Sequence, residues 1–301
     1  MPVQHPAALP TGLQEARELV RFLVDRGNGF RPRTLTVDDG TRLHANEGGH
    51  GPRTALLLHG FCGTHRQLLG VARGLQATHR VCLLDARGHG KSDPFAQRPT
   101  MAQLADDVAA VVAQCEGPVD AIGLSMGAQT LFEYVRRHGL GRLGRLVFID
   151  QAPRLLPDAD GWPHALFGGM SPAEVSAFLA EMEHSPRALG RAWLRGIWRT
   201  NEPLLHRLAL TPALLAGLPG VRARTLTLAA DMVQQDWRDV IPRIERPVLL
   251  CYGGRSMYPG AGRWMHANLP NAQLEWFGAS GHGLAYSEPL RLRRRVAAFL
   301  A

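Results

Sequence analysis

The fold of this 301-residue chain is decided by one short stretch, Gly123-Leu124-Ser125-Met126-Gly127. An apolar run of strand length, 119–122, precedes it, and the residues that follow it, 128–135, are typical of a helix. Two glycines around one serine favour a sharp strand-to-helix turn, because such a turn strains the backbone and leaves no room for a β-carbon. We therefore expect Ser125 to be a nucleophile that stands clear of a sheet, beside the N–H groups at the helix start.

Strand-like apolar runs alternate with helical segments over most of the chain. Further buried strands are predicted at 54–58, 81–84, 145–150, 247–252 and 273–277. The hairpin signal Asp39-Gly40 lies between two alternating segments and predicts that two antiparallel strands open the sheet. Strands that alternate with helices predict an α/β protein with a mostly parallel, doubly wound sheet and helices on both faces.

The pattern changes between residues 151 and 242. Ser171-Pro172-Ala173-Glu174 is a capping box, and short helices are predicted to follow at 186–199, 202–210 and 212–218. No convincing buried strand interrupts them. We expect residues 151–242 to form an all-helical lid, or cap, inserted in a core domain made of residues 1–150 and 243–301.

Charge and composition narrow the range of partners. The formal net charge is +8, but the 34 basic residues are scattered, apart from a cluster at 291–295 that is interpreted as the solvated face of a terminal helix, so we expect no nucleic-acid partner. No apolar run is long enough to span a membrane, and the start of the chain lacks a secretory apolar region. These features predict a cytoplasmic protein without a membrane partner, and they leave its oligomeric state open.

Near the start of the chain, a helix is expected at 13–24.

The four cysteines favour free, buried thiols. Cys62, Cys82, Cys115 and Cys251 lie far apart, and three of them fall in or beside apolar runs. This spacing fits neither a zinc site nor a disulfide framework. Since the sequence also lacks a dinucleotide-binding glycine pattern, we expect no metal and no cofactor.

Two further glycine-rich loops follow predicted strands. His59-Gly60-Phe61 comes directly after 54–58, where a tight bend would turn its amides inward, so the N–H groups of Phe61 and Met126 are candidate donors to an oxyanion. Gly281-His282-Gly283 follows the last predicted strand, and its histidine has the freedom to reach Ser125 as a general base. A third polar loop, 85–94, is interpreted as structural. There Arg87 and either Asp85 or Asp93 would bond the backbone, with His89 as a minor catalytic alternative.

Taken together, the motifs at 59–61, 85–92, 123–127 and 281–282 resemble those of the α/β-hydrolase family. The resemblance implies the fold of that family, a Ser-His-acid triad, and an oxyanion hole at Phe61 and Met126. Family members usually place the acid a few residues beyond the strand that here is 248–252, yet residues 253–258 contain no carboxylate.

The acid of the triad must therefore come from elsewhere. Asp150, at the end of the strand after the nucleophile strand, is the favoured candidate, a placement similar to that in some haloalkane dehalogenases. The alternatives are Asp231, Asp236 and Asp239, or no acid at all.

We expect acyl transfer to water on a small or medium apolar ester, with the triad Ser125, His282 and Asp150. The residues expected to line the substrate pocket are Trp162, Phe167, Met170, Trp237 and Met257. A serine nucleophile argues against haloalkane dehalogenase and epoxide hydrolase activity, which use an aspartate there. Thioesterase, lactonase, cofactor-free haloperoxidase or perhydrolase, and carbon–carbon bond hydrolase activities remain alternatives, as does a non-catalytic ligand receptor on the same scaffold.

Overall fold

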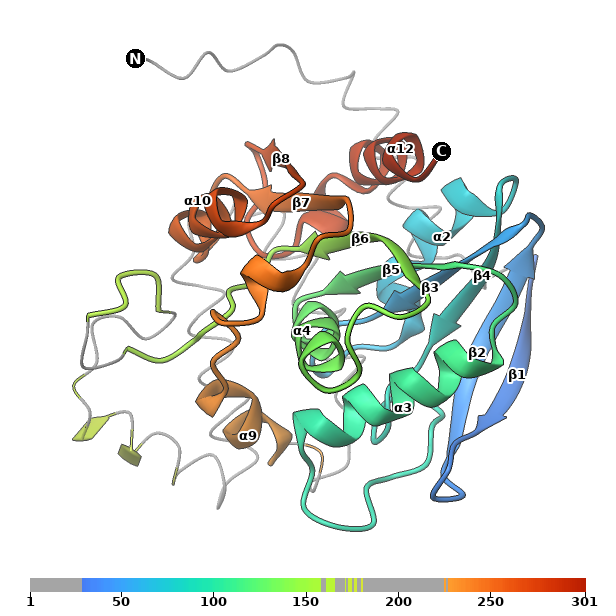
Figure 1. Cartoon of the computed structure of the whole chain (residues 1–301), viewed down its shortest axis with the longest axis horizontal. Helices are drawn as coiled ribbons and strands as arrows, with labels where there is room; N and C mark the ends of the chain where they lie inside the picture. Colours follow the sequence, from blue (N-terminus) through green and yellow to red (C-terminus); the bar gives the residue numbers. More distant parts are fainter. Residues whose placement is uncertain are drawn as a thin grey trace.

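The computed structural model describes residues 29–157, 161–165, 171, 173, 174, 176, 177, 180, 225 and 227–301. Within these residues the chain forms one eight-stranded sheet in the order β1-β2-β4-β3-β5-β6-β7-β8 (Figure 1). The strands are β1 (Phe30–Thr36), β2 (Arg42–Gly49), β3 (Arg53–Leu58), β4 (His79–Leu84), β5 (Val119–Leu124), β6 (Leu143–Ile149), β7 (Val248–Gly253) and β8 (Ala272–Phe277).

The sheet is mostly parallel, as the sequence predicted. β1 and β2 form an antiparallel hairpin around Asp39-Gly40, and β2 pairs antiparallel with β4. Every other neighbouring pair, from β4 through β8, is parallel. The carboxyl ends of β3 to β8 therefore meet at one edge of the sheet, which is where parallel sheets gather their ligands.

Alternate residues of each central strand feed two separate apolar cores, one on each face. Leu56 and Leu58 of β3 pack into the first core, whereas Ala55 and Leu57 pack into the second. This period of two, in strands that are apolar throughout, is what burial on both faces requires.

Helices cover both faces of the sheet. α3 (Met101–Gln114), α4 (Met126–His138), α9 (Leu228–Gln234) and α10 (Pro259–Asn268) contribute to the first core. α2 (Leu69–Leu75), α11 (Leu284–Ser287) and α12 (Pro289–Leu300) contribute to the second. Two short 3₁₀ segments are also present, η1 (His65–Leu68) and η3 (Ile241–Arg243). In Figure 1, α3 and α4 lie on one side of the sheet and α2 and α12 lie on the other.

The two ends of the segment 151–242 lie side by side. Arg154 and Asp236 form an isolated antiparallel bridge, and the Trp237 N–H donates to the Pro153 carbonyl over 2.9 Å. The predicted capping box is present: the Ser171 N–H donates to the Glu174 carboxylate over 2.7 Å, and the Glu174 N–H donates to Ser171 Oγ over 3.3 Å. The predicted helices at 13–24, 186–199, 202–210 and 212–218 lie outside the described residues, so the helical lid stays a prediction.

All four cysteines are free thiols, and only Cys115 is not fully buried. Among the described helices, none is both long and apolar enough to cross a bilayer.

Candidate active site

Ser125 occupies the turn between β5 and α4. Its φ of +51° lies in the left-handed region, which a residue with a side chain adopts only at a cost of about 1–3 kcal/mol. The flanking glycines allow the turn, because a β-carbon on Gly127 would collide with the Leu58 carbonyl oxygen and one on Gly123 would collide with the backbone of α4. The Ser125 N–H donates to the Ile149 carbonyl over 3.0 Å, which fixes the turn to β6. The nucleophile turn predicted from sequence is thus present in the backbone.

His282 lies on the loop between β8 and α11 and joins two side chains from other strands. Its Nδ1 is 2.6 Å from Asp150 Oδ2, and its Nε2 is 3.1 Å from Ser125 Oγ. A carboxylate can only accept, so Nδ1 carries the proton and, in the neutral ring, Nε2 presents a lone pair to the serine hydroxyl. The ring is thereby placed to receive the proton of Ser125.

Asp150 directly follows β6 and is fully buried. Its φ is +50°. In the described parts of the chain, Asp150, Ser125 and Cys62 are the non-glycine residues whose φ lies in the left-handed region. Its Oδ1 accepts the Gly253 N–H over 2.9 Å, and its Oδ2 accepts the Ser256 hydroxyl over 2.5 Å in addition to His282. Strained residues gather at functional sites, and here all three lie at the carboxyl edge of the sheet.

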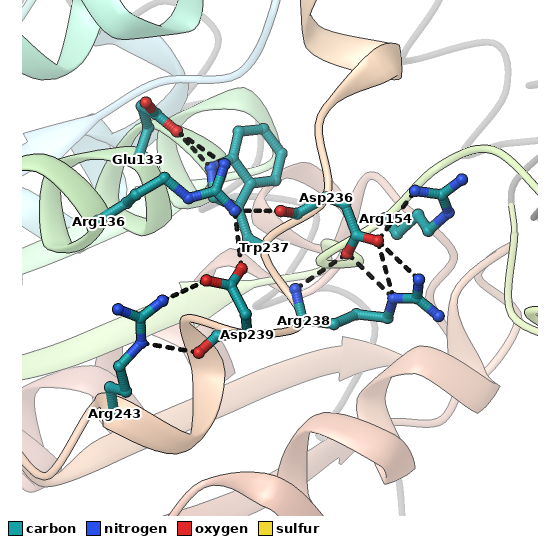
Figure 2. Close-up of polar contacts among 8 residues, drawn as sticks. All are labelled: Glu133, Arg136, Arg154, Asp236, Trp237, Arg238, Asp239 and Arg243. Carbon is teal, nitrogen blue, oxygen red and sulfur yellow. Dashed lines mark hydrogen bonds and ion pairs between the residues drawn. The ribbon is translucent and has the colours of Figure 1, made fainter.

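The three alternative acids are bonded elsewhere. Asp231 accepts the Met101 N–H over 2.7 Å and so caps α3. Figure 2 shows Asp236 between Arg154 and Arg238, at 2.9 and 2.6 Å, and Asp239 between Arg136 and Arg243. Of the candidate acids, the structure brings only Asp150 to His282.

Phe61 and Met126 lie on the two turns that flank this site. Met126 is the first residue of α4, so its N–H has no acceptor within the helix. Phe61 lies at the centre of a turn closed by a 2.9 Å bond from the Gly63 N–H to the Gly60 carbonyl. β3 and β5 are neighbours in the sheet, which brings the two turns together. The oxyanion role of their N–H groups stays a prediction.

The side chain of His59 holds the turn that contains Phe61 in place. Its Nε2 accepts the Ala86 N–H over 3.0 Å, so Nδ1 is the protonated nitrogen and donates to the Gly60 carbonyl over 2.8 Å. Burial lowers the pKa of this imidazole, which keeps it neutral. Cys62 is no rival nucleophile, because burial raises the pKa of its thiol to about 12.

The polar loop after β4 is structural, with one correction. As predicted, Asp85 and Asp93 accept backbone N–H groups, Asp85 from His65 over 2.7 Å and Asp93 from Arg42 over 3.0 Å. Arg87 instead bonds two carboxylates, Asp107 and Asp39, each at 2.6 Å. A backbone carbonyl carries no charge, so two carboxylates, the buried Asp107 and the exposed Asp39, are stronger partners for a buried guanidinium.

His89, the minor alternative in that loop, is fully buried beneath Phe61, with ring centroids 5.9 Å apart. Its Nδ1 is 3.0 Å from the Arg87 carbonyl. Burial lowers its pKa to about 3, so the ring stays neutral at ordinary pH. The structure does not bring it to Ser125 or Asp150.

Three of the five predicted pocket residues, Trp162, Trp237 and Met257, lie in the described part of the chain. Trp237 is fully buried; its indole N–H donates to Glu133 over 2.7 Å and its ring contacts Phe132, so it belongs to the core beneath α4 and not to an open pocket. Trp162 is 6% exposed and packs edge to face on Trp264. Met257 is half-buried and directly follows Ser256, whose hydroxyl bonds Asp150. Phe167 and Met170 lie outside the described residues.

Sequence reasoning missed the turn after β7. Gly253 and Ser256 bond Asp150, and the buried ring of Tyr258 lies 5.5 Å from that of His282. One feature of the sequence could have indicated this role. Residues 253–258 contain no carboxylate, so the polar groups in this segment had no function assigned to them.

The sequence model of the alpha/beta hydrolase family matches residues 55–295, and the chain belongs to that family. A pimeloyl-[acyl-carrier protein] methyl ester esterase of Aromatoleum aromaticum is 28% identical over 245 residues, covering 78% of this chain and 92% of the relative. A non-heme haloperoxidase of Rhodococcus erythropolis is 26% identical over 273 residues, covering 83% and 92%. An esterase structure from Exiguobacterium antarcticum superimposes with a TM-score of 0.76 at 24% identity, covering 89% of this chain and 99% of that one. The structural match shows the fold, and the sequence relatives support hydrolysis of ester bonds at the level of the family.

Proposed function

We propose that this chain is a serine esterase that works through an acyl-enzyme on small or medium apolar esters. The observation that carries the proposal is the continuous contact from Ser125 Oγ through the His282 ring to Asp150, at 3.1 and 2.6 Å. Nucleophile, base and orienting acid in hydrogen-bond contact are the arrangement that activates a serine hydroxyl. Relatives named as esterases support the choice of substrate class.

The first half of the reaction follows from the protonation states. His282 Nε2 takes the proton of Ser125 while Oγ bonds to the ester carbonyl carbon, and the buried Asp150 carboxylate stabilises the resulting imidazolium. The N–H groups of Phe61 and Met126 would hold the oxyanion, each contributing about 3 kcal/mol. The imidazolium then gives its proton to the departing alcohol as the carbon–oxygen bond breaks.

The second half repeats these roles with water. His282 takes a proton from water, the hydroxide bonds to the acyl carbon, and Ser125 leaves with the proton returned by the imidazolium. Residues 151–242, whose ends meet at the bridge of Arg154 with Asp236, would form a lid over the site.

Peracid formation is a second candidate, favoured by the match to a protein named as a non-heme haloperoxidase. In that case hydrogen peroxide replaces water at the acyl carbon, giving a peracid and free Ser125. The same residues serve both reactions, so adding peroxide to an ester assay and measuring peracid yield separates them.

A panel of p-nitrophenyl esters tests the esterase proposal, with Ser125→Ala as the variant. We expect turnover to fall by about 10⁴-fold or more, because the acyl-enzyme cannot form. A fluorophosphonate should label the wild type on the peptide that contains Ser125 and should leave the variant unlabelled.

Ser287→Ala is the matched control, since Ser287 is half-buried and bonds Ser280 rather than His282. It should retain turnover and labelling. Persistent turnover in Ser125→Ala would refute the proposal, and tight ester binding without turnover in the wild type would favour a receptor.

A further inference from the structure

The Asp150 carboxylate is held by a single turn that follows β7, and this inference rests on the function proposed for the site. Gly253 donates its N–H to Oδ1 over 2.9 Å, and Ser256 donates its hydroxyl to Oδ2 over 2.5 Å. The Ser256 N–H donates to the Gly253 carbonyl over 3.1 Å, which closes the turn. Both carboxylate oxygens of Asp150 therefore accept hydrogen bonds from this turn, from donors that lie three residues apart.

We infer that Ser256 is a positioning residue for the proposed reaction, acting on His282 through the oxygen of Asp150 that both side chains share. The direction of its hydroxyl is fixed, because Ser256 Oγ accepts the Tyr258 N–H over 3.1 Å and its own proton is left for Asp150. The side chain is itself buried. It does not touch Ser125.

The His282 loop packs directly on this turn. A β-carbon on Gly253 would collide with the carbonyl oxygens of Ser280 and Gly281, so glycine is needed for the loop to lie this close. The turn therefore sets the position of the acid and of the loop that carries the base. A shift of Ser256 would therefore move both Asp150 and the loop that carries His282.

The hydroxyl also sets how strongly the acid attracts the imidazolium. A donor on Oδ2 disperses the negative charge of Asp150 and weakens its pull on the His282 proton. Among the described residues, Cys251, Tyr252 and Tyr258 are buried titratable groups that interact electrostatically with this carboxylate. Burial raises the pKa of each, so all three are neutral at ordinary pH, and Ser256 is left as the neutral donor that adjusts the pair.

The test is the pH profile of kcat/KM for Ser256→Ala. We expect kcat/KM at pH 7 to fall by about tenfold. The acid limb of the profile should move up by about half to one pH unit, because a more basic carboxylate keeps the base protonated to higher pH. Ser256→Thr keeps the hydroxyl and should restore both values.

Ser280→Ala is the matched control. Ser280 is buried two residues before His282, but its hydroxyl donates to Glu288 over 2.6 Å. Its loss should leave the acid limb in place. Ser256→Cys, with a side chain of similar size and a weak donor, gives the same readout if the alanine variant does not fold.

A double-mutant cycle with Asp150→Asn separates positioning from general damage. If Ser256 acts through the acid, its replacement in the Asp150→Asn background should change kcat by less than about twofold. The inference would be overturned if the losses of kcat in the two single variants multiply in the double variant. It would also be overturned if Ser256→Ala shows the pH profile of kcat/KM of the wild type. Because Ser125→Ala tests the nucleophile alone, loss of turnover there with no effect at Ser256 would refute this inference and leave the proposed function standing.

Discussion

Two buried aspartates at opposite ends of neighbouring parallel strands each contact a histidine. Asp120 lies at the start of β5 and contacts His79 Nε2 at 3.2 Å, whereas Asp150 lies beyond the end of β6 and contacts His282 Nδ1 at 2.6 Å. Both carboxylates are fully buried. What differs is the rest of each carboxylate's surroundings.

At the amino end of the sheet the charge is neutralised permanently. Arg53 gives Asp120 two bonds of 2.6 Å, and the Arg145 N–H gives another of 2.6 Å. Burial would raise the pKa of this carboxyl, but the bonds from Arg53 and His79 outweigh it and lower the pKa to about 2. Such a pair holds the fold together and takes no part in proton exchange.

At the carboxyl edge, the partners of Asp150 within the described residues include neither arginine nor lysine. In the proposed reaction, the charge that compensates it there is the imidazolium of His282, which forms when Ser125 gives up its proton. The contrast indicates that an aspartate–histidine pair serves catalysis when the carboxylate lacks a permanent cation and the second ring nitrogen faces a nucleophile.

The matched substitutions Asp150→Asn and Asp120→Asn give the largest expected difference. Asp150→Asn should lower kcat by about 10³–10⁴-fold with little change in the melting temperature, because the base loses its orienting charge. Asp120→Asn should destabilise the fold by about 2–3 kcal/mol, since Arg53 loses its counter-charge, and should keep kcat within a few-fold. Steady-state kinetics and urea unfolding measure the two effects. Equal loss of kcat in both variants would break the comparison.

The second largest expected effect is on the pH dependence of the unfolding free energy, to which the ion pair of Asp120 with Arg53 should contribute. The Asp120 pKa is lowered from 3.8 to about 2, so its contribution to stability is fully present above the unfolded value and is lost as the pH falls toward 2. Urea unfolding at pH 5, 4 and 3 should show a smaller decline for Asp120→Asn than for the wild type. Identical declines would mean that this carboxyl does not titrate differently in the folded state.

A third buried carboxylate, Glu133 on α4, provides the smallest expected effect. It accepts the Trp237 indole N–H over 2.7 Å. Trp237→Phe should cost about 1–2 kcal/mol of unfolding free energy through the lost bond, with kcat and KM of ester hydrolysis within twofold of the wild type. A large rise in KM would restore the substrate-binding role predicted from sequence.

Local patterns were enough to predict much of this molecule. The eight strands, the hairpin at Asp39-Gly40 and the mostly parallel pairing follow from apolar runs and turn residues, which indicate burial and backbone angles directly. Ser125 and His282 were identifiable because each lies among glycines at the end of a predicted strand. Asp150 was one candidate among four, since its sequence neighbours do not show which side chain will face it.

What the sequence determined by itself is the order of strands and helices along the chain, the sharp turn that carries Ser125 and the loop that carries His282, because each depends on residues adjacent in the chain. Only the tertiary structure decided which aspartate meets His282, that Ser256 shares that carboxylate, and that Trp237 belongs to the core. These pairings join residues that are 104 to 132 positions apart in the chain, and they are fixed by the order of the strands in the sheet and by close packing rather than by local preference.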